Sequence, residues 1–372
     1  MNHALAPARL VRGPGVLAEL GAEVARLGRH PLLVHGGLGY ARVRPAIDAA
    51  LDGAGLDTVR ARHDGHVTPG AIAVLRSAAV AAGRDTVVGV GGGRVLDAAK
   101  AAAAAAGLPF VAVPTSPATC AAVTALTVAY DAAGVWAGPI AMAACPDVAL
   151  LDHAALAAAP DRLLAAGVLD ALVKVSEVRL ASRRAAAPDT LLRAALALCD
   201  ELGRLVDPAT GALAAGWPPA PAARAALAEA VVVLPGLIAG LGGEGNKLAA
   251  AHAVHNALTL LPGHDRSLHG ELVAVGLLLQ DALDGAGDAA LVRAIDWMRG
   301  LGIDPSLAAL GCGDVLDDPV AVLERMHAAP SLRRAFPDVS REALWRTLRR
   351  VDRLALGAGG RRTDATAHRV PH

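Results

Sequence analysis

The sequence predicts an N-terminal α/β domain built on a parallel sheet, followed by an all-helical domain. Residues 1–155 alternate short β-rich runs with Ala-rich helical stretches, which is typical of βαβ units. Beyond residue 155 the strand signals stop, and long Ala/Leu segments with helical spacing run to residue 356. With 372 residues, 54% of them apolar, the chain is long enough for two domains that each bury a core.

The elements of the first domain follow one another in regular order. The expected strands are "HPLLVHGG" (30–37), "TVRARHDG" (58–65), "DTVVGVGGG" (85–93), "PFVAVPTS" (109–116) and "PDVALLD" (146–152). The expected helices between them are "YARVRPAIDAALDGAG" (40–55), "TPGAIAVLRSAAVAAG" (68–83) and "RVLDAAKAAAAAAG" (94–107). Such an order favours a parallel sheet with helices on both faces.

The second domain is predicted over residues 156–356 as helices separated by short breaks. Turn residues mark those breaks in "GWPPAP" (216–221), "LPGHD" (261–265) and "GIDPS" (302–306). The last residues, 357–372, show no periodicity and are predicted to form a flexible tail.

Composition restricts the class of partner. Lys plus Arg and Asp plus Glu balance at 35 each, so we expect a small-molecule substrate and neither nucleic acid nor an anionic membrane. The four cysteines form no CxxC pair, and the first residues lack the apolar core of a signal peptide. The Ala-rich run at 100–107 is too short to span a bilayer. We therefore expect a reduced, cytoplasmic protein without a transmembrane segment.

A glycine-rich turn joins a predicted strand to a predicted helix in "VVGVGGGRVLDAAK" (87–100). Three consecutive glycines let backbone amides and a helix N-terminus approach a phosphate, so the turn is a candidate pyrophosphate cradle. Its spacing is not GxGxxG, and such a turn also occurs for packing reasons alone. A second polar turn, with Thr115, Ser116 and Thr119, would lie beside it if the two strands are neighbours. Two polar turns at one sheet edge favour a bound nucleotide.

Four histidines fall within the 21 residues from Ala251 to Glu271. His252 and His255 are three apart on a predicted helix and share a face, and His269 opens the next helix. Imidazoles from two helices suit a metal that accepts nitrogen ligands, with a carboxylate as a further ligand. Asp170, inside an apolar helical run, is the candidate carboxylate. The alternatives are a hydrogen-bonded core aspartate and histidines that cap a helix or face solvent.

Taken together, these motifs resemble the metal-dependent alcohol dehydrogenase family that includes glycerol dehydrogenase and the iron-containing enzymes. The resemblance runs from residue 13 to residue 356. It is carried by "GVGGGRVLDAAK", "VPTSPATCAAVTALTVAYDAAG", "PDVALLD", "AAGVLDALVKVSE" and "AAHAVHNALTLLP…LHGELVAVG". It implies the two-domain architecture also found in dehydroquinate synthase, with NADP or NAD and a divalent metal, Zn²⁺ or Fe²⁺, in the cleft.

Site residues follow from the same resemblance. The implied metal ligands are Asp170, His252 and His269, with His255 beside them as a proton relay. The implied cofactor-binding residues are Gly36, Gly91, Gly92, Gly93, Arg94, Val95, Leu96, Asp97, Lys100, Thr115, Ser116, Pro117, Ala118, Thr119, Thr124, Leu126 and Tyr130. A homo-oligomer is also expected.

Two departures from the glycerol dehydrogenase pattern concern the substrate. Cys120 stands where that enzyme has an aspartate for substrate hydroxyls, and Lys174 stands one turn beyond Asp170, where that enzyme has an uncharged residue. Both resemble the hydroxycarboxylate dehydrogenase branch, so Cys120 and Lys174 are the expected substrate residues, and a 2-oxo or 2-hydroxy acid is the expected substrate. A lysine paired with Glu177 is the alternative explanation of Lys174.

Other functions remain open at this stage. A glycerol or other polyol dehydrogenase is the first alternative. A sugar-phosphate cyclase is the second, although the basic cluster that would hold a substrate phosphate is not visible in the sequence. A non-catalytic protein is the third, although Asp170, His252 and His269 are all present.

Cofactor preference is predicted from a missing carboxylate. Where polyol dehydrogenases carry an aspartate after the second strand, this chain has Gly36 or Gly37, and no carboxylate follows until Asp48. An acidic group at that place favours NAD by repelling a 2′-phosphate. With Arg42 and Arg44 close behind to pair with a 2′-phosphate, we expect NADPH to be used at least as well as NADH. The alternative is that both arginines point to solvent and that the site accepts either cofactor.

Overall fold

The computed structural model describes residues 4–183, 187–206, 213 and 216–358. Six parallel strands form the main sheet in the order β1-β8-β5-β4-β2-β3. Their bounds are β1 (Arg9–Gly13), β2 (Pro31–His35), β3 (Val59–Arg62), β4 (Thr86–Gly91), β5 (Phe110–Pro114) and β8 (Val148–Asp152). Five of these strands lie within the expected runs, and β1 is an additional edge strand that pairs with β8.

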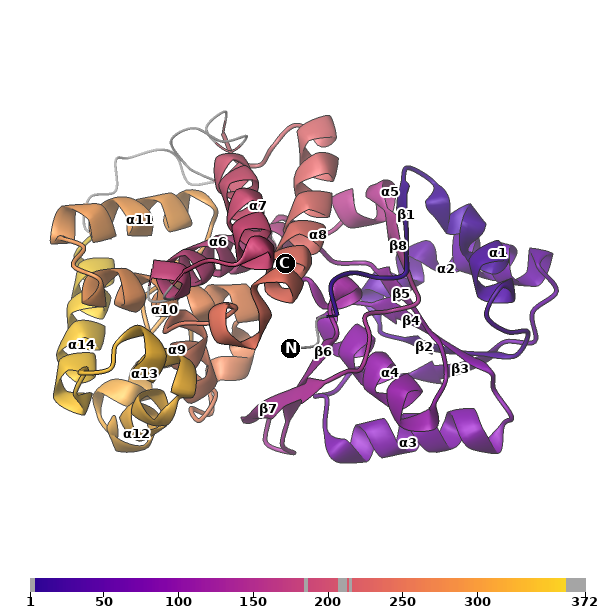
Figure 1. Cartoon of the computed structure of the whole chain (residues 1–372), viewed down its shortest axis with the longest axis horizontal. Helices are drawn as coiled ribbons and strands as arrows, with labels where there is room; N and C mark the ends of the chain where they lie inside the picture. Colours follow the sequence, from indigo (N-terminus) through magenta and orange to yellow (C-terminus); the bar gives the residue numbers. More distant parts are fainter. Residues whose placement is uncertain (1–3, 184–186, 207–212, 214–215, 359–372) are drawn as a thin grey trace, which may run out of the picture.

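Helices cover both faces of the sheet (Figure 1). The helical elements of this half are η1 (Val16–Glu19), α1 (Leu20–Ala25), α2 (Leu38–Gly53), α3 (Pro69–Ala81), α4 (Gly93–Ala106), η2 (Ala121–Val123) and α5 (His153–Ala157). Alternate residues of each strand face opposite sides, so Leu33 packs with η1, α1 and α2, whereas Leu32 and Val34 pack with α3 and α4.

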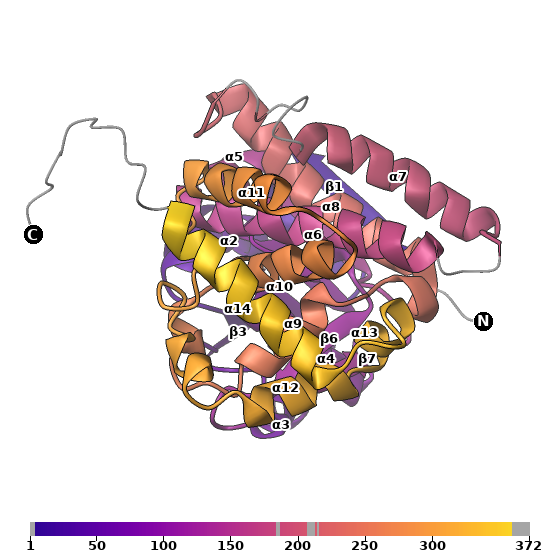
Figure 2. The same cartoon turned by 90° about the vertical axis from the view of Figure 1, so that its left-hand side faces the viewer.

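The second half is helical, and in Figure 2 it faces the viewer. Its helices are α6 (Asp161–Arg183), α7 (Thr190–Val206), α8 (Pro221–Asn246), α9 (Ala251–Leu258), η4 (His264–Arg266), α10 (His269–Leu283), α11 (Asp288–Gly300), η5 (Gly313–Leu316), α12 (Val320–Ala328), α13 (Pro330–Ala335) and α14 (Arg341–Ala358). The first two residues of the predicted tail end α14, and the others lie outside the described residues.

The two halves share one continuous core. Its buried side chains run from the α3/α4 face of the sheet through η2 to α6, α7 and α8. Helix α8 is long and apolar enough over Pro221–Gly243 to span a membrane by length and composition alone. Here it packs in that core, and its Glu229 pairs with Arg12 of β1 and His153 of α5. The packing therefore accounts for α8 as a core helix.

A β-hairpin that the sequence patterns did not predict makes a second junction between the halves. Strands β6 (Leu126–Tyr130) and β7 (Trp136–Ala141) pair antiparallel and reach from the α/β half toward the helical half (Figure 1). The Trp136 amide donates to Thr259 Oγ1 at 3.0 Å, and Arg325 donates to the Trp136 carbonyl at 2.9 Å. The two halves are thus joined by the hairpin as well as by α8.

Candidate metal and dinucleotide site

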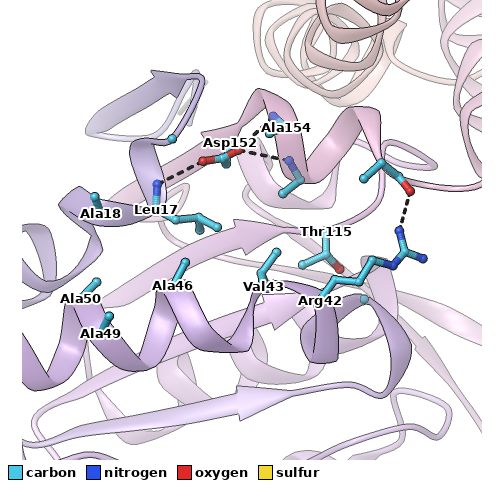
Figure 3. A pocket seen from close by; sticks show the side chains of 14 residues that line it. Leu17, Ala18, Arg42, Val43, Ala46, Ala49, Ala50, Thr115, Asp152 and Ala154 are labelled. Carbon is cyan, nitrogen blue, oxygen red and sulfur yellow. Dashed lines mark hydrogen bonds between the residues drawn. The ribbon is translucent and has the colours of Figure 1, made fainter.

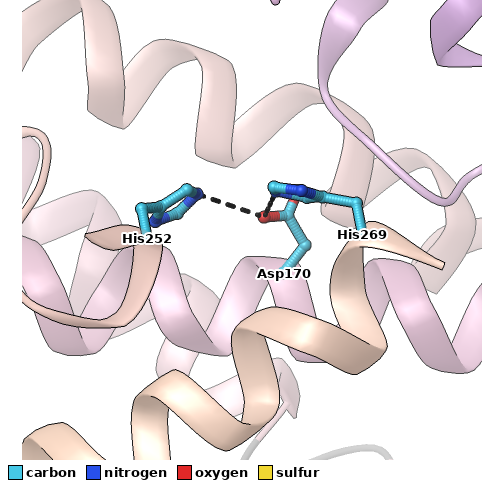
Figure 4. Close-up of side chains that lie close together, drawn as sticks. All are labelled: Asp170, His252 and His269. Atoms are coloured by element: carbon cyan, nitrogen blue, oxygen red, sulfur yellow. Dashed lines mark ion pairs between the residues drawn. The ribbon is translucent and has the colours of Figure 1, made fainter. Parts of the chain in front are cut away.

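Three side chains from three helices converge in the helical half. Asp170 lies in the middle of α6, His252 in the first turn of α9, and His269 at the first position of α10. Asp170 Oδ1 lies 3.9 Å from His252 Nε2 and 3.5 Å from His269 Nε2 (Figure 4). The three potential ligand atoms all lie within 4.8 Å of one another. The structure thus brings together the residues that the sequence analysis assigned to a metal.

Close helix packing produces this convergence. A Cβ at Gly270 would lie 2.6 Å from the carbonyl carbon of Ala166, so only glycine lets the start of α10 approach α6 so closely. Gly276 meets Ala251 of α9 in the same way, since a Cβ there would lie 2.7 Å from the Ala251 Cα. Two glycines therefore set the distances from α10 to α6 and α9.

Glu177 holds the His252 ring. Its carboxylate is fully buried, and Oε2 lies 2.6 Å from His252 Nδ1. Oε1 accepts the backbone amides of Ala249 and His252 at 3.0 Å each. A carboxylate at Nδ1 places the proton there and leaves Nε2 free to bind a metal. The sequence analysis considered Glu177 only as a partner of Lys174 and missed this contact.

His255 holds the His269 ring from behind. Its Nε2 lies 3.0 Å from His269 Nδ1, and its Nδ1 lies 2.9 Å from Asn256 Oδ1. The ring is only 3% exposed, and burial, followed by the neighbouring His269, lowers the pKa of His255 well below its usual range. A neutral His255 can accept the Nδ1 proton of His269, which leaves Nε2 of His269 facing Asp170. In this arrangement His255 orients His269, with one ring nitrogen toward His269 and the other toward Asn256.

Asp170 is ionised despite its burial. Burial alone would raise the pKa of its carboxyl, but the His269 hydrogen bond and the charges of His269, His252 and Lys174 outweigh burial and lower the pKa to about 2. A buried carboxylate with two imidazoles whose Nε2 atoms face it is a donor set that fits Zn²⁺ or Fe²⁺. The residues present therefore fit a divalent metal.

Cys120 and Lys174 lie close to this cluster. Cys120, at the start of η2, is half-buried; desolvation of its thiol and the charge of Asp170 raise its pKa to about 12, so Cys120 is a neutral thiol. Lys174 lies one turn after Asp170 on α6, is 7% exposed, and donates to the Lys247 carbonyl at 3.0 Å. The charges of Asp170 and Lys174 both act on Cys120, so the three residues share one region.

The two polar turns of the α/β half lie side by side, as expected for neighbouring strands. Gly91 of β4 pairs with Pro114 of β5, and a Cβ at Gly93 would lie 2.8 Å from Thr119 Oγ1. Gly92 caps α4 without a side-chain hydrogen bond, so the helix amides are open to an anion. In the second turn, Ser116 Oγ accepts the Ala118 amide at 3.2 Å. Pro117 lies against α6, because a Cβ at Gly167 would be 3.0 Å from the Pro117 carbonyl carbon.

Two of the implied cofactor residues, Lys100 and Asp97, hold backbone groups of the neighbouring segment. The Lys100 ammonium donates to the carbonyls of Ala121, Thr124 and Leu126 and lies 3.1 Å from Asp97 Oδ1. Asp97 Oδ2 in turn accepts the Val128 amide at 3.1 Å. Since three donors meet three carbonyls, Lys100 has none left for a cofactor. The pair anchors η2 and β6, and thereby positions Thr124, Leu126 and Tyr130.

The side chain of Leu96 also points away from the expected ligand. It is 2% exposed and packs in the core behind the glycine turn. Arg94 is exposed in the first turn of α4, and Val95 lines a pocket at the ends of β2, β3 and β4. That pocket, of about 150 Å³, is also lined by Gly36, Gly37, Gly39, Tyr40, His63, Asp64, Gly91, Gly92, Arg94 and Thr115.

A second, apolar groove of about 570 Å³ lies between η1, α2 and α5, and small side chains line most of it (Figure 3). Arg42 points across this groove and donates to the Ala158 carbonyl. Arg44 donates to Asp48 at 3.1 Å on the outside of α2. Both guanidiniums thus have partners elsewhere, and neither arginine is among the residues that line the pocket at Gly36.

The comparison with known proteins agrees with this arrangement. The sequence profile of the iron-containing alcohol dehydrogenases matches residues 7–153. A glycerol dehydrogenase of Pseudomonas putida is 32% identical over 89% of this chain and 91% of its own length. Hydroxycarboxylate dehydrogenase A of Escherichia coli K12 is 39% identical over 55% of this chain and 57% of its own. Among solved structures, a probable glycerol dehydrogenase from Sinorhizobium meliloti 1021 aligns with a TM-score of 0.80 and 29% identity over 96% of this chain and all of its own.

Proposed function

Because the chain belongs to the iron-containing alcohol dehydrogenase family, whose members use NAD(P) and a divalent metal, we propose that this oxidoreductase acts on small 2-oxo and 2-hydroxy acids. It transfers a hydride between the substrate carbon and the nicotinamide. We further propose that it works as a cytoplasmic homo-oligomer, in keeping with its four free cysteines.

The metal site supports the general chemistry. When bound by Asp170, His252 and His269, a divalent metal supplies Lewis-acid polarisation of the substrate oxygen. Glu177 and His255 keep the two imidazoles in the required orientation before substrate arrives.

The observation that carries the substrate class is Lys174. Its ammonium is buried one turn from Asp170, where a substrate held at the metal would place its next functional group. A carboxylate on the carbon beside the carbonyl would gain a charge-assisted contact there. Cys120, a neutral thiol, offers no strong acceptor for the second hydroxyl of a polyol.

A polyol dehydrogenase is the second candidate. The glycerol dehydrogenase of Pseudomonas putida matches along most of the chain, whereas hydroxycarboxylate dehydrogenase A matches over about half of it. This difference in coverage favours neither substrate by itself, because substrate choice depends on the few side chains around the metal.

Steady-state kinetics of the Lys174→Met variant tests the proposal. We expect KM for a 2-oxo acid to rise far more than KM for an uncharged ketone of the same length, since only the acid loses a contact of about 1.5–3 kcal/mol. Equal losses on both substrates would mean that Lys174 only supports the Lys247 carbonyl. Activity on glycerol alone in the unmodified protein would favour the polyol candidate.

We also propose that NADPH is used at least as well as NADH. The support is that neither Gly36 nor Gly37 carries a carboxylate, and that the carboxylate nearest to Gly37, on Asp64, is paired with the cation of Arg62. A Gly36→Asp variant should shift kcat/KM toward NADH. A strong NADH preference in the unmodified protein would contradict this proposal.

A further inference from the structure

The pocket at the ends of β2, β3 and β4 contains residues that the sequence analysis did not assign. β3 runs beside β2 with His35 opposite Arg62, so the three residues Arg62, His63 and Asp64 follow the edge of the sheet next to Gly36 and Gly37. The His63 amide continues the ladder by donating to the His35 carbonyl at 2.9 Å. A segment that is distant in the chain thus lines the two glycines.

A carboxylate and a guanidinium occupy the space above Gly37. A Cβ at this position would lie 3.6 Å from Asp64 Oδ1 and 3.7 Å from Arg62 Nη2. Arg62 and Asp64 also pair with each other, and both side chains remain largely exposed, at 69% and 46%. The sequence analysis found no carboxylate between Gly37 and Asp48. In space, however, the carboxylate of Asp64 lies beside Gly37, at the end of β2.

The side chain of His63 is a second, independent indication of a bound ligand. Its side chain lines the pocket and is only 9% exposed, yet its Nε2 has no hydrogen-bond partner. A buried polar atom without a partner is costly, and a polar atom of a ligand would satisfy it. Burial lowers the pKa of His63, so the ring is neutral and can accept from a hydroxyl.

We propose that Arg62, His63 and Asp64 bind the adenosine ribose of the dinucleotide, and that the Arg62–Asp64 pair sets the choice between NADPH and NADH. The proposal rests on the dinucleotide assignment of the proposed function. In NADH the ribose 2′-hydroxyl donates to Asp64, while in NADPH the 2′-phosphate takes the place of Asp64 as partner of Arg62. His63 Nε2 accepts from a ribose hydroxyl that both cofactors share.

This arrangement predicts opposite effects for the two members of the pair. Arg62→Leu removes the cation and leaves Asp64 to repel a 2′-phosphate, so binding of the phosphorylated ligand weakens. Asp64→Asn removes the repulsion and frees Arg62, so binding of the phosphorylated ligand strengthens. A pair with a purely structural role would change both ligands alike.

The test is calorimetric titration of the full-length protein with 5′-AMP and with 2′,5′-ADP, which differ in the 2′-phosphate and lack nicotinamide. Because neither probe reaches the metal, the result is independent of turnover. For Arg62→Leu we expect the Kd of 2′,5′-ADP to rise about 10- to 100-fold, with little change for 5′-AMP. For Asp64→Asn we expect the Kd of 2′,5′-ADP to fall relative to the Kd of 5′-AMP.

Arg44→Leu is the matched control. Arg44 is also an exposed arginine paired with an aspartate, Asp48, but it lies on the outer face of α2. The Arg44→Leu variant should leave the Kd of 5′-AMP and the Kd of 2′,5′-ADP unchanged. Equal effects of Arg62→Leu and Arg44→Leu, or equal effects of Arg62→Leu on the two probes, would overturn the assignment of Arg62. If the unmodified protein binds neither probe, the dinucleotide assignment itself fails, and the inference fails with it.

Discussion

At the scale of single residues, the metal site depends on side chains that do not touch the metal. Glu177 meets the Nδ1 of His252, and His255 meets the Nδ1 of His269, so each imidazole has one nitrogen fixed within the protein. The ligands are thereby oriented before any ion binds. This explains how charged and polar groups can be buried in an apolar set of helices without large cost.

The role of Glu177 leads to a graded prediction about metal affinity. His269→Ala removes a ligand and should abolish metal content and activity together. Glu177→Gln keeps the shape but weakens the hold on His252, so we expect metal affinity to fall roughly 10- to 100-fold with the fold intact. Competition with a chromophoric chelator measures the metal affinity of both variants.

The control for these variants is His327→Ala. It also removes a half-buried imidazole of the helical half, where Nε2 lies 3.1 Å from the Val339 carbonyl. Metal content should be unchanged. Full metal occupancy in His269→Ala, or unchanged affinity in Glu177→Gln, would contradict this account of the site.

At the scale of elements, helix spacing determines where the ligands lie. The first turn of α10 carries both His269 and Gly270, and Gly270 lies directly against Ala166 of α6. The α6 helix carries Asp170 one turn after Ala166. Any change in the separation of the two helices therefore changes the distance from His269 to Asp170.

A Gly270→Ala variant tests this dependence. The added Cβ would overlap the Ala166 carbonyl, which is backbone and cannot move aside easily, so we expect a loss of about 1–3 kcal/mol of stability and weaker metal binding. Urea denaturation and metal analysis measure the two effects. Gly53→Ala, at the end of α2 with no atom near the new Cβ, should be neutral or slightly stabilising. Normal stability and metal content in Gly270→Ala would show that the helices do not need this close approach.

Elements differ in how well the sequence predicts them. β2, β4, β5 and β8 are short buried apolar runs, and the sequence predicts each of them. β1 is an edge strand, "RLVRG", with exposed and charged residues, so its pattern does not stand out. The β6–β7 hairpin was missed although β-branched and aromatic residues flank "DAAG", because the segment was treated as the continuation of the turn after β5.

Site residues on one element could be predicted from the sequence, whereas contacts between distant segments could not. Spacing along one helix predicts that Asp170 and Lys174 share a face, and the family motifs supply the three ligands. Contacts between distant segments were missed, because no local pattern reports them. Glu177 meets His252 across 75 residues. Asp64 reaches Gly37 from the neighbouring strand, which a search for a carboxylate after β2 cannot find.

At the scale of the whole molecule, the hairpin ties the two halves together. It extends from the α/β half, yet its tip is bound by the helical half: His264 Nε2 lies 3.0 Å from the Gly134 carbonyl, and Thr259 and Arg325 hold both backbone groups of Trp136. With α8 at the other junction, separation of the two halves requires that these contacts be broken.

Hydrogen exchange at the Trp136 amide tests this clamp. Thr259→Val removes the acceptor Oγ1 while keeping the volume of the side chain, so the Trp136 amide should exchange faster, together with neighbouring amides of the hairpin. Thr347→Val, which removes a threonine hydroxyl from α14, should leave the hairpin unchanged. Unchanged protection of Trp136 in Thr259→Val would mean that β6–β7 pairing alone protects the amide.

The pairing of β1 with β8 bears on how the chain folds as it is synthesised. Arg9 lies opposite Val148, so in the described sheet the first strand pairs with the last strand, about 140 residues later. Contacts of such long sequence separation form slowly, because the intervening chain must be ordered first. During synthesis on the ribosome, β2, β4 and β5 can pair and pack with α2 to α4 before β8 has been made, and β1 stays unpaired until then. Completion of the sheet therefore has to await β8, and the contact of α8 with β1 through Glu229 and Arg12 forms only after residues 221–246 have followed.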